Sequence, residues 1–149
     1  MEAANLLSGK RGLVMGVAND KSIAWGIAKA AANQGAKIAF SFQMEGFGKR
    51  LAPLADSIGS SIMIECDVTQ EGSVDHCFVE LATHWPTIDF VVHALAFSDK
   101  NELKGAYMNT SRDNFANTMM VSAYSFTEVA RAASTMMPAG GALVTLSFL

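Results

Sequence analysis

The stretch that decides the fold is GLVMGVANDKSIAWG, residues 12–26. Its first four residues, Gly12–Met15, predict a buried strand, whereas apolar residues recur at helical spacing from Ile23 onward. Gly16 lies at the turn between the two, where a glycine permits a tight turn and a close approach of the backbone to a ligand. A strand, a loop of small residues and a helix start together form the phosphate-binding corner of dinucleotide-binding folds.

This corner departs from the usual Gly-x-Gly-x-x-Gly fingerprint, because Ser22 stands where a second glycine is common. Ser22 and Ile23 lie at the expected helix start, where unpaired N–H groups and the helix dipole favour a pyrophosphate. Gly26, one turn later, is expected to allow close packing of the helix on the strand. An ordinary strand-to-helix turn explains the same spacing equally well, so the spacing alone leaves both interpretations open.

Composition narrows the class of protein. A chain of 149 residues, half of them apolar and 17% charged, can hold one folded domain with a core and does not have the composition of a disordered chain. No apolar run reaches the roughly 18–20 residues that span a bilayer, and the N-terminus does not resemble a secretory signal. The net charge of −3 argues against nucleic acid as the main partner. We therefore expect a single cytoplasmic domain over residues 1–149, with neither a membrane nor a nucleic acid as partner.

The cysteines and histidines predict no metal site. Cys66 and Cys77 lack metal-ligand spacing and lie among apolar residues, so we expect buried free thiols. His76 and His84 share one predicted helix but are separated by neither three nor four residues. His93 lies inside an apolar run, which favours a hydrogen-bonded core residue over a catalytic one.

Apolar runs alternate with helical patterns along the whole chain. The predicted strands are Gly12–Met15, Lys37–Phe42, Ser61–Asp67, Asp89–Phe97 and Ala142–Phe148. The helical patterns cover residues 23–31, 51–58, 74–85 and 111–137, with Gly35 as a C-terminal cap, Ser73 and Ser111 as helix starts, and Pro138 beyond the last helix.

This order predicts an α/β fold of the Rossmann type, a doubly wound parallel sheet with strand order 3-2-1-4-5. Ligands of such sheets bind beyond the carboxyl ends of the strands, where the strand order reverses. We therefore expect a crevice between the first and fourth strands.

Polar residues at the strand ends are candidates for binding a dinucleotide. Gln43 could bond the adenosine ribose without repelling a 2′-phosphate, which Lys49 and Arg50 could accept, so NADPH stays open beside NADH. Asp67 and Val68 lie where an adenine pocket is expected, although an aspartate at a strand end is also a common turn cap, and taken alone the cap is favoured.

Together these pieces resemble the bacterial NADH-dependent enoyl-acyl-carrier-protein reductases, a divergent branch of the short-chain dehydrogenase/reductase superfamily. The matching pieces run in order along the chain: Leu7–Arg11, Gly16–Gly26 with its serine, Gln43, Cys66–Val68, Trp85-Pro86, Val92–Ala94, Ala123–Phe126 and Leu146-Ser147. The change from glycine to serine is a mark of this family.

The resemblance implies a role for each matching residue. Gly16, Ser22 and Ile23 would lie at the cofactor diphosphate, Gln43 at the adenosine ribose, Asp67 and Val68 at the adenine, Leu95 beside the nicotinamide half and Ser98 near the acyl substrate. It implies NADH as cofactor and a trans-2-enoyl thioester on acyl carrier protein as substrate, in fatty-acid elongation. It also implies a homotetramer, built partly through the long helix that starts near Ser111.

One part of the family pattern is missing. The family's catalytic Tyr-x6-Lys, which stabilises the enolate and holds the nicotinamide ribose, does not occur here, since neither Tyr107 nor Tyr124 has a lysine seven residues on. Phe148 occupies a position that is often an additional active-site tyrosine. The resemblance thus implies the N-terminal portion of a longer enzyme, truncated after the fifth strand and inactive as 149 residues alone. Two alternatives stay open: another short-chain reductase, or a non-catalytic dinucleotide-binding module.

Overall fold

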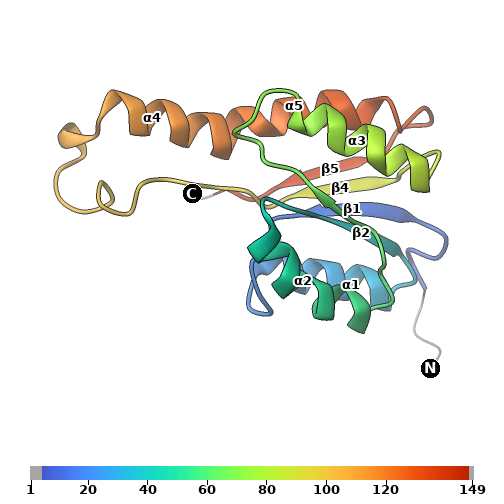
Figure 1. Ribbon diagram of the computed structural model, residues 1–149. Helices are drawn as coiled ribbons and strands as arrows, with labels where there is room; N and C mark the ends of the chain where they lie inside the picture. The colour runs from blue at the N-terminus through green and yellow to red at the C-terminus, as the bar shows by residue number, and fades with distance from the viewer. Residues whose placement is uncertain (1–4, 148–149) are drawn as a thin grey trace.

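Five parallel strands form one sheet in the order β3-β2-β1-β4-β5 in the computed structural model, which describes residues 5–147 (Figure 1). The strands are β1 (Arg11–Met15), β2 (Lys37–Phe42), β3 (Met63–Glu65), β4 (Phe90–His93) and β5 (Ala142–Thr145). The predicted fold class and strand order are confirmed. The strand order reverses between β1 and β4, which is where the sequence predicts the ligand-binding crevice.

Helices cover both faces of the sheet (Figure 1). One face carries α1 (Ile23–Asn33) and α2 (Glu45–Ser57), and the other carries α3 (Ser73–His84) and α5 (Ser125–Ser134). A short 3₁₀ turn, η1 (Tyr107–Asn109), precedes α4 (Arg112–Met119), and a π-helical segment, η2 (Met120–Tyr124), joins α4 to α5. In Figure 1, α4 and the segment that leads to it extend past the carboxyl ends of the strands. The connection therefore borders the edge where a ligand is expected.

The core consists of two apolar clusters, one on each face of the sheet. Alternate residues of β1 supply both, because Leu13 and Met15 belong to the cluster under α3 and α5, whereas Val14 belongs to the cluster under α1 and α2. All three side chains are fully buried. Burial on both faces explains why the strands read as continuous apolar runs without polar alternation.

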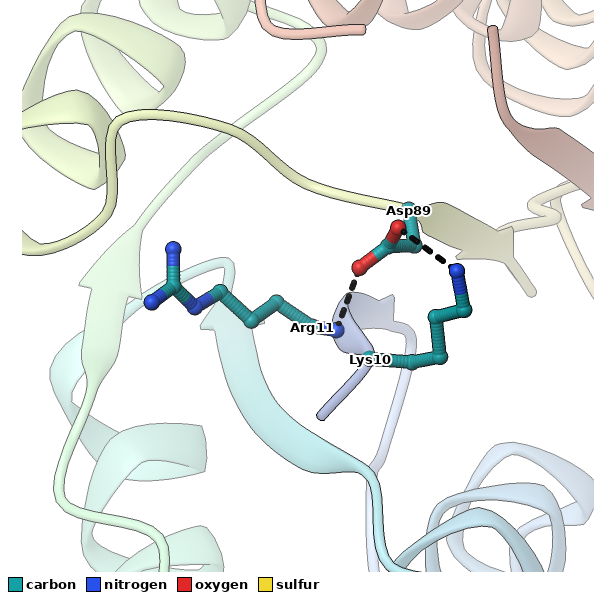
Figure 2. A network of polar contacts seen from close by, with 3 residues as sticks. All are labelled: Lys10, Arg11 and Asp89. Carbon is teal, nitrogen blue, oxygen red and sulfur yellow. Dashed lines mark hydrogen bonds and ion pairs between the residues drawn. The ribbon is translucent and has the colours of Figure 1, made fainter. Parts of the chain in front are cut away.

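Asp89 joins the starts of β1 and β4, as Figure 2 shows. Its carboxylate Oδ2 accepts the Arg11 backbone N–H at 2.9 Å, and its own N–H donates to the Arg11 carbonyl at 2.8 Å. Lys10 Nζ lies 3.4 Å from the Oδ1 atom, whereas the Arg11 side chain extends away from the carboxylate (Figure 2). These bonds hold the register that places Met15 beside His93 at the other end of the two strands.

Three strands are shorter than predicted. β3 covers Met63–Glu65, and β4 ends at His93 although the apolar run continues to Phe97. After His93 the chain leaves the sheet, with one last bond from the Ala94 N–H to the Met15 carbonyl at 3.1 Å. β5 ends at Thr145, and Phe148 lies outside the described residues. The apolar residues after β4 thus line a cavity instead of continuing the strand.

Helix boundaries also differ from the sequence pattern. α2 begins at Glu45, before its first apolar repeat, and its first two residues, Glu45 and Gly46, are exposed. Gly72, at φ +80°, caps α3 in place of Ser73, whose hydroxyl instead accepts the Asp67 N–H at 2.9 Å. The single helix predicted over 111–137 is divided by the π segment, although Ser111 caps its start as expected, through the Asn114 N–H at 3.1 Å.

Gly26 does not have the packing role expected of it. A Cβ atom at this position would meet no atom within 4 Å outside its own helix, and the residue is exposed. α1 packs on the sheet through Ala24, Trp25, Ala28 and Ala31 instead. The glycine expected to pack against a strand therefore faces away from it.

Candidate functional site

Gly16 allows the ends of β1 and β4 to approach closely. Its φ is +99°, a conformation that L side chains rarely adopt. A Cβ atom here would lie 2.0 Å from the Ala94 carbonyl oxygen, so the contact also excludes any side chain. Two features therefore favour glycine at this position: its backbone angle and the lack of space for a Cβ atom.

Ser22 closes the loop that follows Gly16. Its Oγ accepts the backbone N–H groups of Ala18 at 3.0 Å and Asn19 at 3.1 Å. The serine thereby replaces the second glycine of the usual fingerprint with a side-chain bond that shapes the loop. Ile23, directly after it, begins α1 and leaves 69% of its side chain exposed. N–H groups of a first helical turn have no partner inside their helix, so this end of α1 suits an anionic group.

Two adjoining cavities lie at the carboxyl ends of the strands. The smaller, about 180 Å³, is lined by Gly16, Val17, Ala18, Ser41, Phe42, Gln43, Phe47, Cys66, Ala94, Leu95 and Ala96. The larger, about 380 Å³, is lined by Gln43, Met44, Cys66, Asp67, Val68, Thr69, Leu95, Ala96, Phe97, Asn117 and Val121. Four residues belong to both walls, so the two hollows form a continuous site across the point where the strand order reverses.

Gln43 and Asp67 meet in this site although they are 24 residues apart in the sequence. The Gln43 Nε2 donates to Asp67 Oδ1 at 3.3 Å, and the same oxygen accepts the Thr69 N–H at 3.0 Å and its hydroxyl at 2.7 Å. Asp67 therefore caps its turn, which is the interpretation that the sequence favoured, and also lies on the wall of the larger cavity. Its carboxylate is held in place by three donors.

Ser98 lies outside the walls of both cavities, in the segment between β4 and α4. Its Oγ accepts from Asn114 Nδ2 at 3.2 Å, and the same amide donates to Glu102 Oε2 at 3.3 Å. Glu102 also accepts the Ser111 N–H at 2.8 Å and its hydroxyl at 2.7 Å. These bonds lower the pKa of Glu102, and the bond from the Ser111 N–H has the largest effect. The segment is thus tied to the start of α4.

His93 is the hydrogen-bonded core residue that the sequence favoured. It is fully buried, with Nδ1 3.0 Å from Thr145 Oγ1 and Nε2 2.7 Å from Ser125 Oγ. Burial lowers its pKa, which favours the neutral ring. A neutral imidazole with both nitrogens bonded inside the core serves the fold, and the cavities lie elsewhere.

The structure gathers five of the predicted residues around the cavities: Gly16, Gln43, Asp67, Val68 and Leu95. Ser22 and Ile23 lie at the loop and helix start beside this site, and Ser98, predicted near the substrate, lies in the segment before α4 and bonds Asn114. Sequence reasoning missed Ser41, Phe47, Asn117 and Val121 as wall residues. Nothing in their local pattern marks them, because only the packing of the helices on the sheet brings them to the site.

Residues 5–147 contain no group of three or more His, Cys, Asp or Glu side chains placed to hold a metal ion. Within the same range, no helix is long and apolar enough to cross a membrane.

Comparison with known proteins gives consistent matches. The family model described as Enoyl-(Acyl carrier protein) reductase matches residues 16–149. Enoyl-[acyl-carrier-protein] reductase [NADH] 2 of Rhizobium meliloti is 54% identical over 96% of this chain, which covers 53% of that protein. Crystal structures of FabI from Candidatus Liberibacter asiaticus and of the reductase from Anaplasma phagocytophilum in complex with NAD superpose with TM-scores of 0.97 and 0.95, at 57% and 52% identity.

The two solved structures are matched over 98% and 99% of this chain but over 57% and 56% of their own lengths. The chain therefore spans about half the length of the proteins that it matches.

Proposed function

The chain belongs to the enoyl-acyl-carrier-protein reductase family, and we propose that the protein containing it uses NADH to reduce trans-2-enoyl thioesters carried on acyl carrier protein. The observation that carries this proposal is the continuous site at the point where the strand order reverses, with a glycine at its corner whose backbone angle and close contact disfavour any side chain. Bound NADH would supply a hydride to the β-carbon of the enoyl group. The residues of this chain would bind and orient that cofactor.

We assign each part of the dinucleotide to a part of the site. The diphosphate would lie at Gly16 and at the start of α1, beside Ser22 and Ile23, where helix N–H groups and the dipole favour an anion. Gln43 would bond the adenosine ribose, and Asp67 and Val68 would border the adenine. The family resemblance assigns Leu95 to the nicotinamide half, and this residue borders both cavities just after β4.

Charges around Gln43 favour NADH over NADPH. The amide of Gln43 bonds the Asp67 carboxylate, whose negative charge would repel a 2′-phosphate at this place. Lys49 pairs with Glu45 at 2.8 Å, and the guanidinium of Arg50 lies 5.8 Å from the ring centre of Phe47. The two cations that could accept a 2′-phosphate thus have other partners.

The resemblance also supports a substrate site and an assembly. Ser98 would lie near the acyl chain, in the segment that leads to α4. The exposed apolar side chains of α4 and η2 would form part of a homotetramer interface; they are Phe115, Met119, Met120 and Tyr124. A cytoplasmic location completes the proposal. Residues 1–149 contain no Tyr-x6-Lys, so the chain would provide the cofactor-binding half of the enzyme.

A steady-state assay tests this function on the full-length protein. We expect crotonyl thioester to be reduced with loss of NADH absorbance, more efficiently than with NADPH, and a 3-ketoacyl thioester to be a poor substrate. Preference for the ketoacyl thioester would instead support another short-chain reductase. NADH binding without turnover of either thioester would support a non-catalytic binding module. Residues 1–149 alone should give no turnover.

A further inference from the structure

One side chain of the π-helical segment η2 fixes the position of a cavity wall. Phe97 lies shortly after the end of β4 and borders the larger cavity. The Ser122 Oγ accepts the Phe97 N–H at 3.1 Å, and the same hydroxyl donates to the Phe97 carbonyl at 3.2 Å. A single side-chain group therefore bonds both backbone groups of this residue, in place of the neighbouring strand that would bond them inside the sheet.

The wall, defined as Leu95–Phe97, is held at both of its ends. Before it, the Ala94 N–H donates to the last carbonyl of β1 at 3.1 Å, and at its last residue lie the two bonds of Ser122. The next bond along the chain joins the Asp99 N–H to Asn114 Oδ1 at 2.9 Å, outside the wall. Ser122 is thus the side chain that fixes the end of the wall that lies away from the sheet.

This wall faces the cavity to which the proposed function assigns the adenine. The turn after β3 contributes Asp67–Thr69 to the lining of the larger cavity, and the Leu95–Phe97 wall contributes all three of its residues. Val121, directly before Ser122, borders the same cavity, so η2 both lines the cavity and holds its wall. The space available to a flat ring between turn and wall therefore depends on where the wall is held.

We propose that Ser122 is a positioning residue for the cofactor, which holds the Leu95–Phe97 wall where the cavity accepts the adenine ring. This inference rests on the proposed function, because that function assigns the adenine to this cavity. Ser122 itself lines neither cavity, so it acts through Phe97. Without its two bonds the wall would reach other positions, and the affinity would fall in proportion to the time that the wall spends in the binding arrangement.

Titration calorimetry on the full-length protein tests this inference, with NADH and ADP as separate probes. Ser122→Ala removes both bonds to Phe97, and we expect the Kd of each probe to rise about tenfold. The two factors should agree within about twofold, because the wall acts on the adenosine half that both probes contain.

Two further variants separate the hydroxyl from general effects of substitution. Ser122→Thr keeps the hydroxyl and should restore both Kd values to within about twofold of those of the unsubstituted protein. Ser134→Ala, the matched control, removes an exposed hydroxyl of α5 that donates to the Arg131 carbonyl of its own helix at 2.7 Å. It should leave both Kd values unchanged. Urea denaturation measures the stability of each variant.

Unchanged Kd values in Ser122→Ala, whatever its stability in urea, would show that the serine serves only the fold and would overturn the inference. Weaker binding of NADH with unchanged binding of ADP would also overturn it, because the effect would then lie outside the adenine cavity. If the unsubstituted protein binds both probes but reduces no thioester, the reductase proposal fails, and the Kd values alone decide the inference. If it binds neither probe, both proposals fail.

Discussion

Single residues determine whether the site can exist, and Gly16 shows this most clearly. Its backbone angle and its contact with the Ala94 carbonyl both exclude a side chain, whereas Gly26 has open space around it. We expect Gly16→Ala to lower the free energy of unfolding by about 1–3 kcal/mol. Gly26→Ala, the control, should raise it by up to about 1 kcal/mol, because alanine is the better helix former. Urea denaturation measures both, and equal effects would contradict this account of the corner.

His93 makes stability depend on pH. Its folded pKa lies below the ordinary value of 6.5, so the unfolded chain binds the proton more readily. The stability contribution of a neutral His93 is therefore complete above pH 6.5 and is lost as the pH falls toward the folded pKa. In a His93→Gln variant, the free energy of unfolding should depend less on pH between about 7.5 and 5.5. Identical pH dependence of the two proteins would show that His93 does not contribute.

For single residues, the sequence predicted candidate site residues better than it predicted their hydrogen-bond partners. The end positions of strands were enough to select Gln43 and Asp67 as candidates, and the family resemblance added Leu95. The bond between Gln43 and Asp67 could not be predicted, because it joins the ends of two strands whose spacing depends on the sheet. That Cys66 and Cys77 belong to one core cluster was hidden for the same reason, since it depends on how α3 packs.

Among the elements, the bond network of Asp89 fixes how β1 and β4 align (Figure 2). Asp89→Ala leaves the partly buried Arg11 N–H without its acceptor, and we expect a loss of about 1–3 kcal/mol in the free energy of unfolding. Lys10→Ala, the control, removes only an exposed ion pair and should cost less than about 1 kcal/mol. A larger loss for the lysine than for the aspartate would refute the role given to the carboxylate.

The order and type of the elements were predictable, and some of their ends were not. Apolar periodicity predicted the five strands and the helices between them, because burial on the sheet requires it. The same apolar signal placed Phe97 in β4, although the chain leaves the sheet at His93 to line a cavity. The π segment was also missed, because a shift in backbone hydrogen bonding leaves the helical period almost unchanged.

At the scale of the whole molecule, we expect the exposed apolar surface of α4 and η2 to form part of the proposed tetramer interface. Met120 leaves 43% of its side chain exposed there, beside Met119 and Tyr124. We expect Met120→Glu to shift the full-length protein from tetramer to smaller species in sedimentation velocity, because a charge cannot be buried without a partner. Val79→Glu, at an exposed position of α3, should leave the assembly unchanged. Loss of assembly in both variants, or in neither, would count against this interface.

We propose that NADH binds in the hollow where the strand order reverses. Hydrogen–deuterium exchange of the full-length protein, with and without NADH, tests this most directly. We predict slower exchange around Gly16–Ile23, Gln43, Cys66–Val68 and Ala94–Ala96 when NADH is bound. Protection confined to a separate hollow beside Lys37 and Ser60, at the amino end of β2, would contradict it.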